Sequence, residues 1–330
     1  MGLDPHQIVS AEEIAPQEES GVVVLTTVEA LFTQYLDLFG KPTREFLKKL
    51  VPYAKDIQEK VQIAELTLER KMEEFQDRQA RATTFAEYIM EFKSLKIPVE
   101  KYVELIPTIK QRVYSICSSS DYRPGKCQLL VVREDWEAKG GDTKFGLCSS
   151  FLTFVRPNQY LVGHSTHSVM KIPDDTTVPI FMAGLGTGLA PFRAYVEQRK
   201  HQKDEGAKVG PMTLFFGGRY SKTEYYYRSE FEAFEKEGIV KCCNAWSRDT
   251  PGKKVYVQNK IKEEEDDIWE HLGKPGSRGF FFLCGSKQPE KDVYKTLIGI
   301  MQTKGNMSES KAQAKMEELQ ASGRYVTEVY

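Results

Sequence analysis

Residues 178–198 combine three glycines with an apolar run before them and a helical pattern after them. Gly184, Gly186 and Gly188 lack side chains, so backbone N–H groups in this turn can approach an anion closely. The N-terminal end of the following helix carries partial positive charge, which favours a phosphate group there. The spacing departs from the G-x-G-x-x-G pattern, because Leu189 stands at the third glycine position. The stretch therefore predicts either a phosphate site or a tight turn between packed elements.

A second group of polar side chains follows the next apolar run and suits a 2′-phosphorylated adenosine. An arginine can hold a phosphate with two parallel hydrogen bonds, a lysine adds a compact charge, and a tyrosine ring offers a face for adenine. The alternative is a basic loop that is only solvated, as most such clusters are. The members of this group are Arg219, Ser247, Arg248, Lys254, Tyr256 and Gln258.

Two earlier motifs complete an ordered series: Arg-Val-Tyr-Ser at 112–115 and Gly-Leu-Cys-Ser at 146–149. After the glycine turn and the basic group, the series ends with Phe-Leu-Cys-Gly at 282–285 and the terminal Tyr330. In this order, and over nearly the whole chain, the motifs resemble the FAD/NADPH module of diflavin reductases, the family of cytochrome P450 reductase. The glycine turn and the C-terminal motifs are most similar to the branch of sulfite reductase flavoproteins and pyruvate:NADP⁺ oxidoreductase.

For the flavin, the resemblance implies contacts from both early motifs. Arg112 would bind the FAD pyrophosphate, Tyr114 would stack on the isoalloxazine ring, and Ser115 would form a hydrogen bond near N5, where hydride arrives. Backbone N–H groups of the second motif would receive the flavin's diphosphate. The residues that contribute them are Gly146, Cys148 and Ser149.

For the nicotinamide nucleotide, the resemblance implies that Gly186 and Thr187 hold the NADP(H) pyrophosphate and that the basic group binds the 2′-phosphate and adenosine. Cys284 would lie beside the nicotinamide, and Tyr330 would cover the flavin face that the nicotinamide must reach. Glu328 stands where many relatives carry aspartate, which leaves its part in positioning the nicotinamide open. The catalytic residues expected on this basis are Ser115, Cys284, Glu328 and Tyr330.

The resemblance further implies an NADPH-dependent flavoprotein oxidoreductase. Hydride would pass between NADP(H) and FAD, and the flavin would then exchange single electrons with an FMN or flavodoxin-like domain, an iron–sulfur protein or a haem protein. Two alternatives remain open. The chain could be the C-terminal part of a pyruvate:NADP⁺ oxidoreductase that runs toward NADP⁺ reduction, or a non-catalytic nucleotide-binding or interaction remnant without flavin.

The composition is that of an ordinary soluble globular protein, with 28% charged and 40% hydrophobic residues. A formal net charge of −1 argues against nucleic-acid partners and polybasic membrane contacts. Because no apolar run is long enough to span a bilayer and no secretory signal is recognisable, we expect a cytoplasmic or organellar protein. The six cysteines form no C-x-x-C pair, and His164 and His167 lack further ligands nearby, so no metal site is expected.

The periodicity changes twice along the chain. Helical patterns are predicted from Thr26, where Thr26-x-x-Glu29 is a candidate capping box for a helix that lasts until Gly40. Short β-type runs follow at 128–132 and 150–155. Further apolar runs then alternate with helical stretches, which indicates a parallel α/β sheet. These runs lie at 178–182, 213–216, 240–245 and 279–284.

The predicted fold class is α/β and ferredoxin-NADP reductase-like. Residues 1–25 are expected to be a poorly ordered lead-in, 26–105 an α-helical region inserted in the FAD domain, 106–170 an incomplete FAD-binding β-barrel and 171–330 the NADP-binding α/β domain. In the family, several antiparallel barrel strands precede the helical region, so we expect about half of the barrel to be absent and the chain to be part of a longer polypeptide. An open barrel would lack a wall of the flavin pocket.

Overall fold

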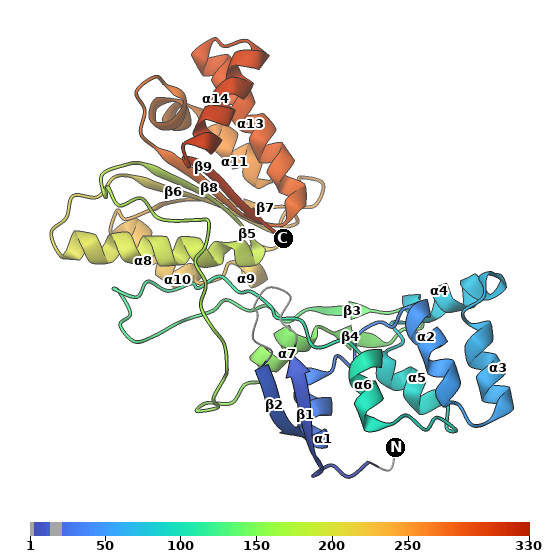
Figure 1. The fold of residues 1–330 in the computed structure, drawn as a ribbon. Coiled ribbons are helices and arrows are strands. Elements are labelled where there is room, and N and C mark those ends of the chain that lie inside the picture. The colour runs from blue at the N-terminus through green and yellow to red at the C-terminus, as the bar shows by residue number, and fades with distance from the viewer. Residues whose placement is uncertain (1–2, 14–21) are drawn as a thin grey trace. The chain divides into compact units, whose positions relative to one another are not determined.

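The structure is a computed structural model that describes residues 3–13 and 22–330, folded into two compact units (Figure 1). The first unit comprises residues 1–113 and 133–156, and the second comprises 114–132 and 157–330. The segment 114–132, which the sequence places in the barrel region, is therefore part of the same unit as the parallel sheet.

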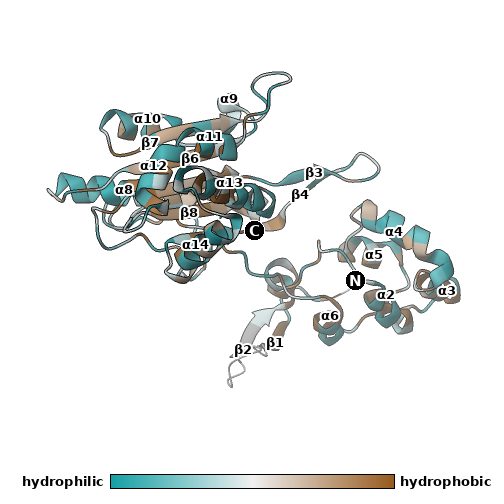
Figure 2. Cartoon of the chain, turned by 90° about the horizontal axis from the view of Figure 1, so that it is seen from above, coloured by the Kyte–Doolittle hydropathy of each residue, from teal (hydrophilic) through white to brown (hydrophobic). Residues whose placement is uncertain are grey.

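The first unit is built mainly from short helices around one apolar core. Leu47, Leu50 and Tyr88 are fully buried in this core, and the helices turn their polar residues outward (Figure 2). The helices are α1 (Val28–Ala30), α2 (Arg44–Leu50), α3 (Ile57–Glu65), α4 (Met72–Ala80), α5 (Phe85–Glu91), α6 (Val99–Leu105) and α7 (Leu147–Thr153). Side chains of the preceding residues cap four of the helices in the described part of this unit, α1, α2, α3 and α5; at α3, for example, Asp56 accepts from the Glu59 N–H at 2.9 Å.

The predicted capping box at Thr26 and Glu29 is wrong by one residue. Thr27 is the N-cap of α1, and its hydroxyl accepts from the Ala30 N–H at 3.2 Å, while Thr26 belongs to a strand. The helix also ends earlier than predicted, because α1 continues only as a π-helical turn to Tyr35 and does not reach Gly40. Threonines adjacent in sequence compete for the same cap, and the strand that ends at Thr27 decides between them.

Two antiparallel strand pairs lie in the first unit. Strands β1 (Ile8–Glu13) and β2 (Val22–Thr27) pair with each other, and β3 (Asp135–Glu137) pairs with β4 (Thr143–Phe145). The prediction of a poorly ordered lead-in is therefore wrong for residues 8–13 and 22–25, where a valine-rich partner lets polar residues join a hairpin. The same prediction also covers residues 1–2 and 14–21, which lie outside the described residues.

The two β-type runs predicted before residue 160 are not strands. Residues 150–155 fall mainly in helix α7, which begins after Gly146, and the run at 128–132 contributes only the isolated bridge between Leu129 and Ile116. A short apolar run fits a strand and a single helical turn equally well, so periodicity alone does not separate them.

The second unit contains a five-stranded parallel sheet in the order β7-β6-β5-β8-β9. The four strands predicted after residue 177 are confirmed to within two residues at their starts and three at their ends, and a fifth strand, β9, was missed. Because the chain runs from β5 outward to β7 and then returns to β8, the strand order reverses between β5 and β8. The strands are β5 (Ile180–Leu185), β6 (Met212–Gly218), β7 (Lys241–Trp246), β8 (Phe280–Gly285) and β9 (Tyr325–Val329).

Helices cover both faces of this sheet, which explains why its strands are apolar without alternation. Phe181, Phe215 and Phe281 pack against one helical layer, whereas Met182 and Phe282 pack against the other. Helices α8 and α10 lie on one face and α11, α13 and α14 on the opposite face (Figure 1). The helices are α8 (Ala190–Asp204), α9 (Ser221–Glu224), α10 (Arg228–Lys236), α11 (Val257–Glu263), α12 (Glu265–Ile268), α13 (Lys287–Gly305) and α14 (Glu309–Ala321).

Among the described residues, no helix combines the length and the apolar character needed to cross a membrane.

Candidate functional site

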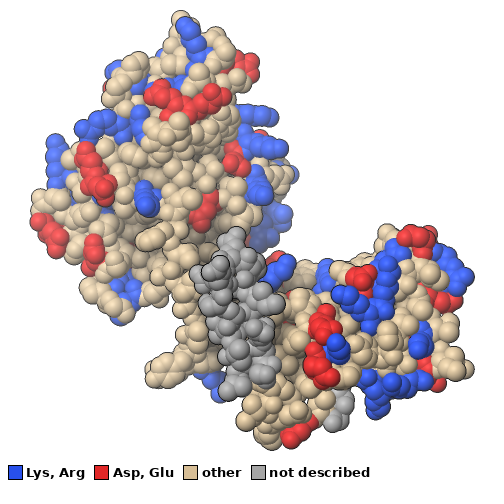
Figure 3. Space-filling model, viewed as in Figure 1, with Lys and Arg blue, Asp and Glu red and all other residues tan. Residues whose placement is uncertain are grey.

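Five parallel strands place their carboxyl ends along one edge of the sheet, and most residues predicted to bind the nicotinamide nucleotide follow these ends. Such edges bind ligands beside the point where the strand order reverses, here between β5 and β8. Blue side chains gather near the C-terminus of the chain, on the side of the second unit where the sheet ends (Figure 3). The predicted residues that follow a strand at this edge are Gly186, Thr187, Arg219, Ser247, Arg248 and Tyr330.

Each of the three glycines near the end of β5 and in the turn after it has a different structural role. Gly184 faces Phe192 of α8, and a Cβ there would lie 3.1 Å from the ring. Gly186 has φ +57° with no atom within 4 Å of an added Cβ, so this backbone is both left-handed and open. Gly188 packs against β8, where its Cβ would lie 2.1 Å from the Cys284 carbonyl oxygen. The turn therefore fits a phosphate cradle at Gly186, with close packing on both sides of it.

Thr187 and Tyr330 meet at the switch point of the sheet. The Thr187 Oγ1 lies 2.7 Å from the Tyr330 hydroxyl, and the Tyr330 N–H donates to the Gly285 carbonyl at 3.1 Å. The terminal tyrosine extends β9 beyond β8 and keeps 64% of its surface exposed. The structure thus brings the end of the chain onto the glycine turn.

The loops after β6 and β7 are joined by hydrogen bonds to backbone carbonyls. The Arg248 N–H donates to the Arg219 carbonyl at 2.9 Å, and the Ser247 hydroxyl donates to the Gly218 carbonyl at 3.3 Å. The Arg219 guanidinium is already paired, since its Nε lies 2.6 Å from Glu224 Oε1. A phosphate that binds Arg219 would have to compete with that carboxylate.

Arg248 and Lys254 are the cations of the group that are available to an anion. Among the residues that the structure describes, neither side chain makes an ion pair, and both are exposed. Tyr256 stands at the start of α11 and is 43% exposed, and its N–H donates to the Asn259 side chain at 2.8 Å. Gln258 lies within α11, and its Nε2 is 3.5 Å from Asp292. These donors and the open aromatic face fit a phosphorylated adenosine.

Cys284 and Glu328 are brought together by strand register. They are direct partners in the pairing of β8 with β9. The Glu328 Oε2 accepts from the Ser168 hydroxyl at 2.9 Å, a contact that the sequence analysis did not foresee. Cys284 is buried, and this burial, with Glu328 nearby, raises the pKa of its thiol to about 12. The thiol is therefore neutral throughout the physiological pH range.

Alkaline unfolding should report this buried thiol. Because the folded pKa of Cys284 lies above its ordinary value of 9.0, the unfolded chain loses the proton first. The free energy of unfolding should consequently fall as the pH rises from about 9 toward 12, and the contribution is fully present below pH 9. Denaturant unfolding between pH 7 and 10.5 should give a shallower decline for Cys284→Ala. Equal slopes in the two proteins would contradict the raised pKa.

In the first unit, Arg112 and the motif at 146–149 carry the residues expected to bind the FAD phosphates. The Arg112 guanidinium donates to the Lys110 carbonyl. Gly146 is the N-cap of α7, so the N–H groups of Cys148 and Ser149 lie in the first helical turn, where no carbonyl precedes them in the helix. The Ser149 hydroxyl accepts from the Glu134 N–H at 3.1 Å and is used within the chain. Backbone donors, rather than this hydroxyl, fit a diphosphate here.

Tyr114 and Ser115, the residues expected at the flavin ring, open the segment 114–132 of the second unit. They lie outside the helices and strands, just before Ile116, which bridges Leu129. Cys117 follows and is completely buried. A set of contacts that the sequence analysis did not predict holds this segment on helix α8. The advance signal was a charged pair at i and i+4, Arg193 and Glu197, within the mainly apolar first half of the helix.

Among the described residues, no group of three or more His, Cys, Asp or Glu side chains is arranged to hold a metal ion.

Comparison with known proteins identifies both parts of the chain. Residues 1–151 match the FAD binding domain family, and residues 182–295 match the oxidoreductase NAD-binding domain family. Among the curated relatives, the chain is 34% identical over 336 residues to the sulfite reductase [NADPH] flavoprotein component of Saccharomyces cerevisiae, covering 100% of this chain and 32% of the relative.

Two further relatives are similar to the chain at comparable sequence identity, and the chain again covers only part of each. It is 33% identical over 324 residues to NADPH–cytochrome P450 reductase of Drosophila melanogaster, with 92% of this chain and 46% of the relative covered. It is 31% identical over 329 residues to mitochondrial pyruvate dehydrogenase [NADP(+)] of Euglena gracilis, with 100% and 18% covered. The chain thus spans less than half the length of each of these relatives.

The order of an FAD binding domain followed by an NAD-binding domain defines a flavoprotein oxidoreductase module. The chain belongs to the FAD- and NADP-binding modules of the diflavin reductases. The predictions of family, of fold class and of FAD and NADP(H) as cofactors are confirmed. The assignments of individual site residues and the domain boundaries stay predictions.

Proposed function

We propose that this chain transfers hydride between NADP(H) and FAD and that the flavin then exchanges single electrons with a separate acceptor. The observation that carries the proposal is the single sheet edge that collects the glycine turn, the paired loops at Arg219 and Arg248, and the Cys284–Glu328 pair. Within one unit, this edge offers backbone N–H groups that can donate to a phosphate, the exposed guanidinium of Arg248 and the buried neutral thiol of Cys284. The relatives at comparable identity are NADPH oxidoreductases by name, which supports the same reaction class.

On the nucleotide side, the chain's residues bind and orient. Gly186 and Thr187 would hold the NADP(H) pyrophosphate at the open left-handed turn. The 2′-phosphate and adenosine would be bound by Arg219, Ser247, Arg248, Lys254, Tyr256 and Gln258. Cys284 and Glu328 would border the nicotinamide, with the thiol in its protonated form. Selectivity for NADP(H) over NAD(H) would come from Arg248 and Lys254, the two exposed cations of the group that make no ion pair with any described residue.

On the flavin side, Arg112 and the backbone of Gly146, Cys148 and Ser149 would bind the FAD phosphates. Tyr114 would stack on the ring and Ser115 would donate a hydrogen bond near its reactive nitrogen. FAD supplies the chemistry that accepts a hydride and passes on electrons singly. The protein's contribution is position, exclusion of water and hydrogen bonding at the ring.

The names of the relatives indicate what kind of acceptor could take the electrons. The relatives include a sulfite reductase component, a cytochrome P450 reductase and a pyruvate dehydrogenase [NADP(+)]. We therefore propose that an FMN or flavodoxin-like domain, an iron–sulfur protein or a haem protein takes the electrons, in a cytoplasmic or organellar setting. With a pyruvate-oxidising partner, the flow would reverse toward NADP⁺ reduction.

Titration calorimetry with FAD and with NADP⁺ tests this function directly. The proposal expects both to bind at one site per chain, and NAD⁺ to bind at least tenfold more weakly than NADP⁺, as expected from the loss of a charged hydrogen bond worth about 1.5–3 kcal/mol. Binding of NADP⁺ without any binding of FAD would favour the alternative of a non-catalytic nucleotide-binding remnant. Equal affinity for both nucleotides would refute the role given to the cations.

Tyr330 is expected to limit access of the nicotinamide. Stacking of one aromatic ring on another adds about 0.5–1.5 kcal/mol beyond burial, which a nicotinamide could overcome at a cost in occupancy. Deleting Tyr330 should therefore strengthen NADP⁺ binding, slow its release and narrow the difference between NADPH and NADH in stopped-flow flavin reduction. Tyr330→Phe, which keeps the ring and removes the hydroxyl that lies 2.7 Å from the Thr187 Oγ1, is the milder companion variant. Unchanged NADP⁺ affinity and NADH rates would mean that the terminal tyrosine lies outside the site.

A further inference from the structure

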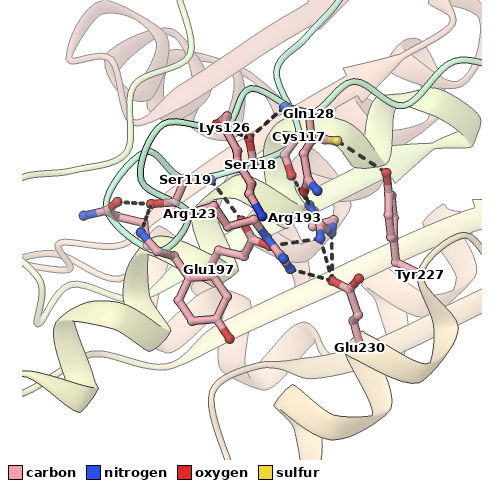
Figure 4. Close-up of polar contacts among 12 residues, drawn as sticks. Cys117, Ser118, Ser119, Arg123, Lys126, Gln128, Arg193, Glu197, Tyr227 and Glu230 are labelled. Carbon is pink, nitrogen blue, oxygen red and sulfur yellow. Dashed lines mark hydrogen bonds and ion pairs between the residues drawn. The ribbon is translucent and has the colours of Figure 1, made fainter. Parts of the chain in front are cut away.

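The buried guanidinium of Arg193 joins three parts of the second unit that are distant in sequence (Figure 4). Its side chain is 1% exposed. The Nη1 atom donates to the Cys117 carbonyl at 2.6 Å and to Gln128 Oε1 at 2.9 Å, both in the segment 114–132. The Nη2 atom lies 2.7 Å from Glu230 at the start of α10. All of its donors are thus turned toward partners within the protein.

The charges around Arg193 balance, so the cluster is stable without an outside ligand. Glu197, which is fully buried, lies 3.0 Å from Arg193 and 2.6 Å from Arg123. Hydrogen bonding to Glu197 raises the pKa of Arg123. Two arginines therefore face two glutamates, Glu197 and Glu230. Removing one member would leave a buried charge without its partner, which is costly.

Tyr227 shows that the cluster holds strained backbone. This bulky residue has φ +53°, the left-handed region, at the N-cap of α10. The Arg193 guanidinium lies 4.2 Å from the centre of the Tyr227 ring. The Tyr227 hydroxyl lies 3.4 Å from the Cys117 Sγ. Burial raises the pKa of Tyr227 to about 12, so the phenol keeps its proton. Strain of this kind persists only where the surroundings determine the conformation.

The segment that carries Tyr114 and Ser115 closes on itself through the Cys117 N–H, which donates to the Gln128 carbonyl at 2.8 Å, and helix α8 provides several of the contacts that hold it on the rest of the unit. Besides the Arg193 contact to Cys117, the Ser119 N–H donates to Glu197 at 3.0 Å, and the Ser119 hydroxyl contacts Gln198. Arg193 is the fourth residue of the helix that begins directly after the glycine turn. One helix therefore carries the phosphate turn at its start and holds the segment expected at the flavin ring.

We propose that Arg193 is a positioning residue for hydride transfer: it latches residues 114–119 onto the nucleotide-binding helix α8 and so fixes the flavin-facing side chains relative to the NADP(H) turn. The latch follows from contacts within the second unit, whereas its effect on catalysis rests on the proposed function. Misplacing reacting groups by about 1 Å costs on the order of 10²-fold in rate. Arg193→Met should consequently slow flavin reduction more than it weakens nucleotide binding.

Arg199 provides a matched control, because it is a second arginine on α8 that is also 1% exposed. Its guanidinium donates to the Pro173 carbonyl at 2.7 Å and to Gln202 at 2.6 Å. In the described part of the chain, Arg199 makes no hydrogen bond or ion pair with residues 114–119. Arg199→Met removes an equally buried guanidinium from the same helix. A general loss of stability should affect both variants, whereas loss of the latch should affect Arg193→Met alone.

The first readout requires no flavin: alkylation of the full chain with iodoacetamide, with each cysteine followed by mass spectrometry. In Arg193→Met, we expect buried Cys117 to react at least tenfold faster than in the unaltered protein because the segment opens locally. Cys284, buried in β8, should stay protected, and exposed Cys127 is the internal reference. Cys117 that stays protected in Arg193→Met would overturn the latch.

If Arg193→Met also exposes Cys284, the unit has unfolded. Two more conservative variants then test whether the Arg193 cluster holds the segment that contains Cys117. Arg193→Lys keeps the charge without the forked donors, and Tyr227→Phe removes only the hydroxyl near Cys117. Both should release Cys117 to an intermediate degree with Cys284 protected. Protection of Cys117 in both variants would refute the latch.

The second readout is stopped-flow reduction of added FAD by NADPH. In Arg193→Met, the limiting rate should fall at least tenfold while the NADPH concentration that gives half of it stays within about threefold, and Arg193→Lys should recover part of the rate. Arg199→Met should leave the limiting rate unchanged. Released Cys117 with an unchanged limiting rate would overturn the positioning role. Absence of flavin reduction in the unaltered protein would instead show that the proposed function, and with it the catalytic part of this inference, is wrong.

Discussion

Arg248→Ala is expected to weaken NADP(H) binding about tenfold to a hundredfold and to leave NAD(H) binding nearly unchanged. The side chain is exposed on the loop after β7 and, among the described residues, makes no ion pair that a phosphate would have to displace. Loss of a hydrogen bond to a charged group costs about 1.5–3 kcal/mol, which corresponds to this range of affinity. Fluorescence titration with NADPH and NADH measures both values.

Arg278→Ala is the matched control for Arg248→Ala. Arg278 precedes β8 at the opposite edge of the same sheet, has an exposed side chain and pairs with Asp175, so its removal changes the charge of the unit equally. It should leave both affinities unchanged. Equal losses for NADPH and NADH in Arg248→Ala would mean that Arg248 contacts a part common to both nucleotides or supports the fold.

Gly188→Ala is expected to destabilise the protein by about 3 kcal/mol, at the upper end of what overpacking usually costs. The added Cβ would lie 2.1 Å from the Cys284 carbonyl oxygen and 2.5 Å from its carbonyl carbon, both backbone atoms of β8, which is paired on both sides. Backbone in a parallel sheet cannot move without disturbing its neighbours. The turn would therefore shift away from β8, and the free energy of unfolding in urea should fall accordingly.

Gly186→Ala separates crowding from backbone conformation. The site has no atom within 4 Å of the added Cβ, but its φ of +57° lies in the region that side chains disfavour. A penalty of about 1–2 kcal/mol is expected for that conformation. If Gly188→Ala proved no more destabilising than Gly186→Ala, the close approach of the turn to β8 would be refuted.

The parallel sheet was predictable because its physical signal is strong. Strands buried on both faces read as continuous apolar runs, and β5, β6, β7 and β8 begin within two residues of the predicted runs. Strand β9 gave no such signal, because Tyr325–Val329 mixes apolar and polar residues at the edge of the sheet. Helix α7 was taken for a strand because its apolar run is too short for periodicity to decide.

The sequence predicts which loops form the candidate site, but not the side-chain contacts that hold these loops in place. Residues after parallel strands must share one edge, so the neighbourhood of Thr187, Arg219 and Arg248 follows from the order of strands and turns. The pairing of Arg219 with Glu224 and of Glu328 with Ser168 depends on loop conformation, which no sequence pattern encodes.

The Arg193 cluster was out of reach for a different reason. Its partners Cys117, Gln128 and Glu230 lie 76, 65 and 37 residues away in the chain. A single arginine in a helical pattern is ordinarily solvated, and only tertiary packing reveals that this one is buried.

The central claim is that this module passes hydride from NADPH to FAD. The most direct measurement is anaerobic mixing of the FAD-loaded chain with NADPH or NADH while the visible absorbance of the oxidised flavin is followed. The account predicts that NADPH bleaches the flavin and that NADH at the same concentration does so at least tenfold more slowly, in line with one charged phosphate contact of about 1.5–3 kcal/mol. Flavin that stays oxidised under saturating NADPH, or equal rates with the two nucleotides, would contradict it.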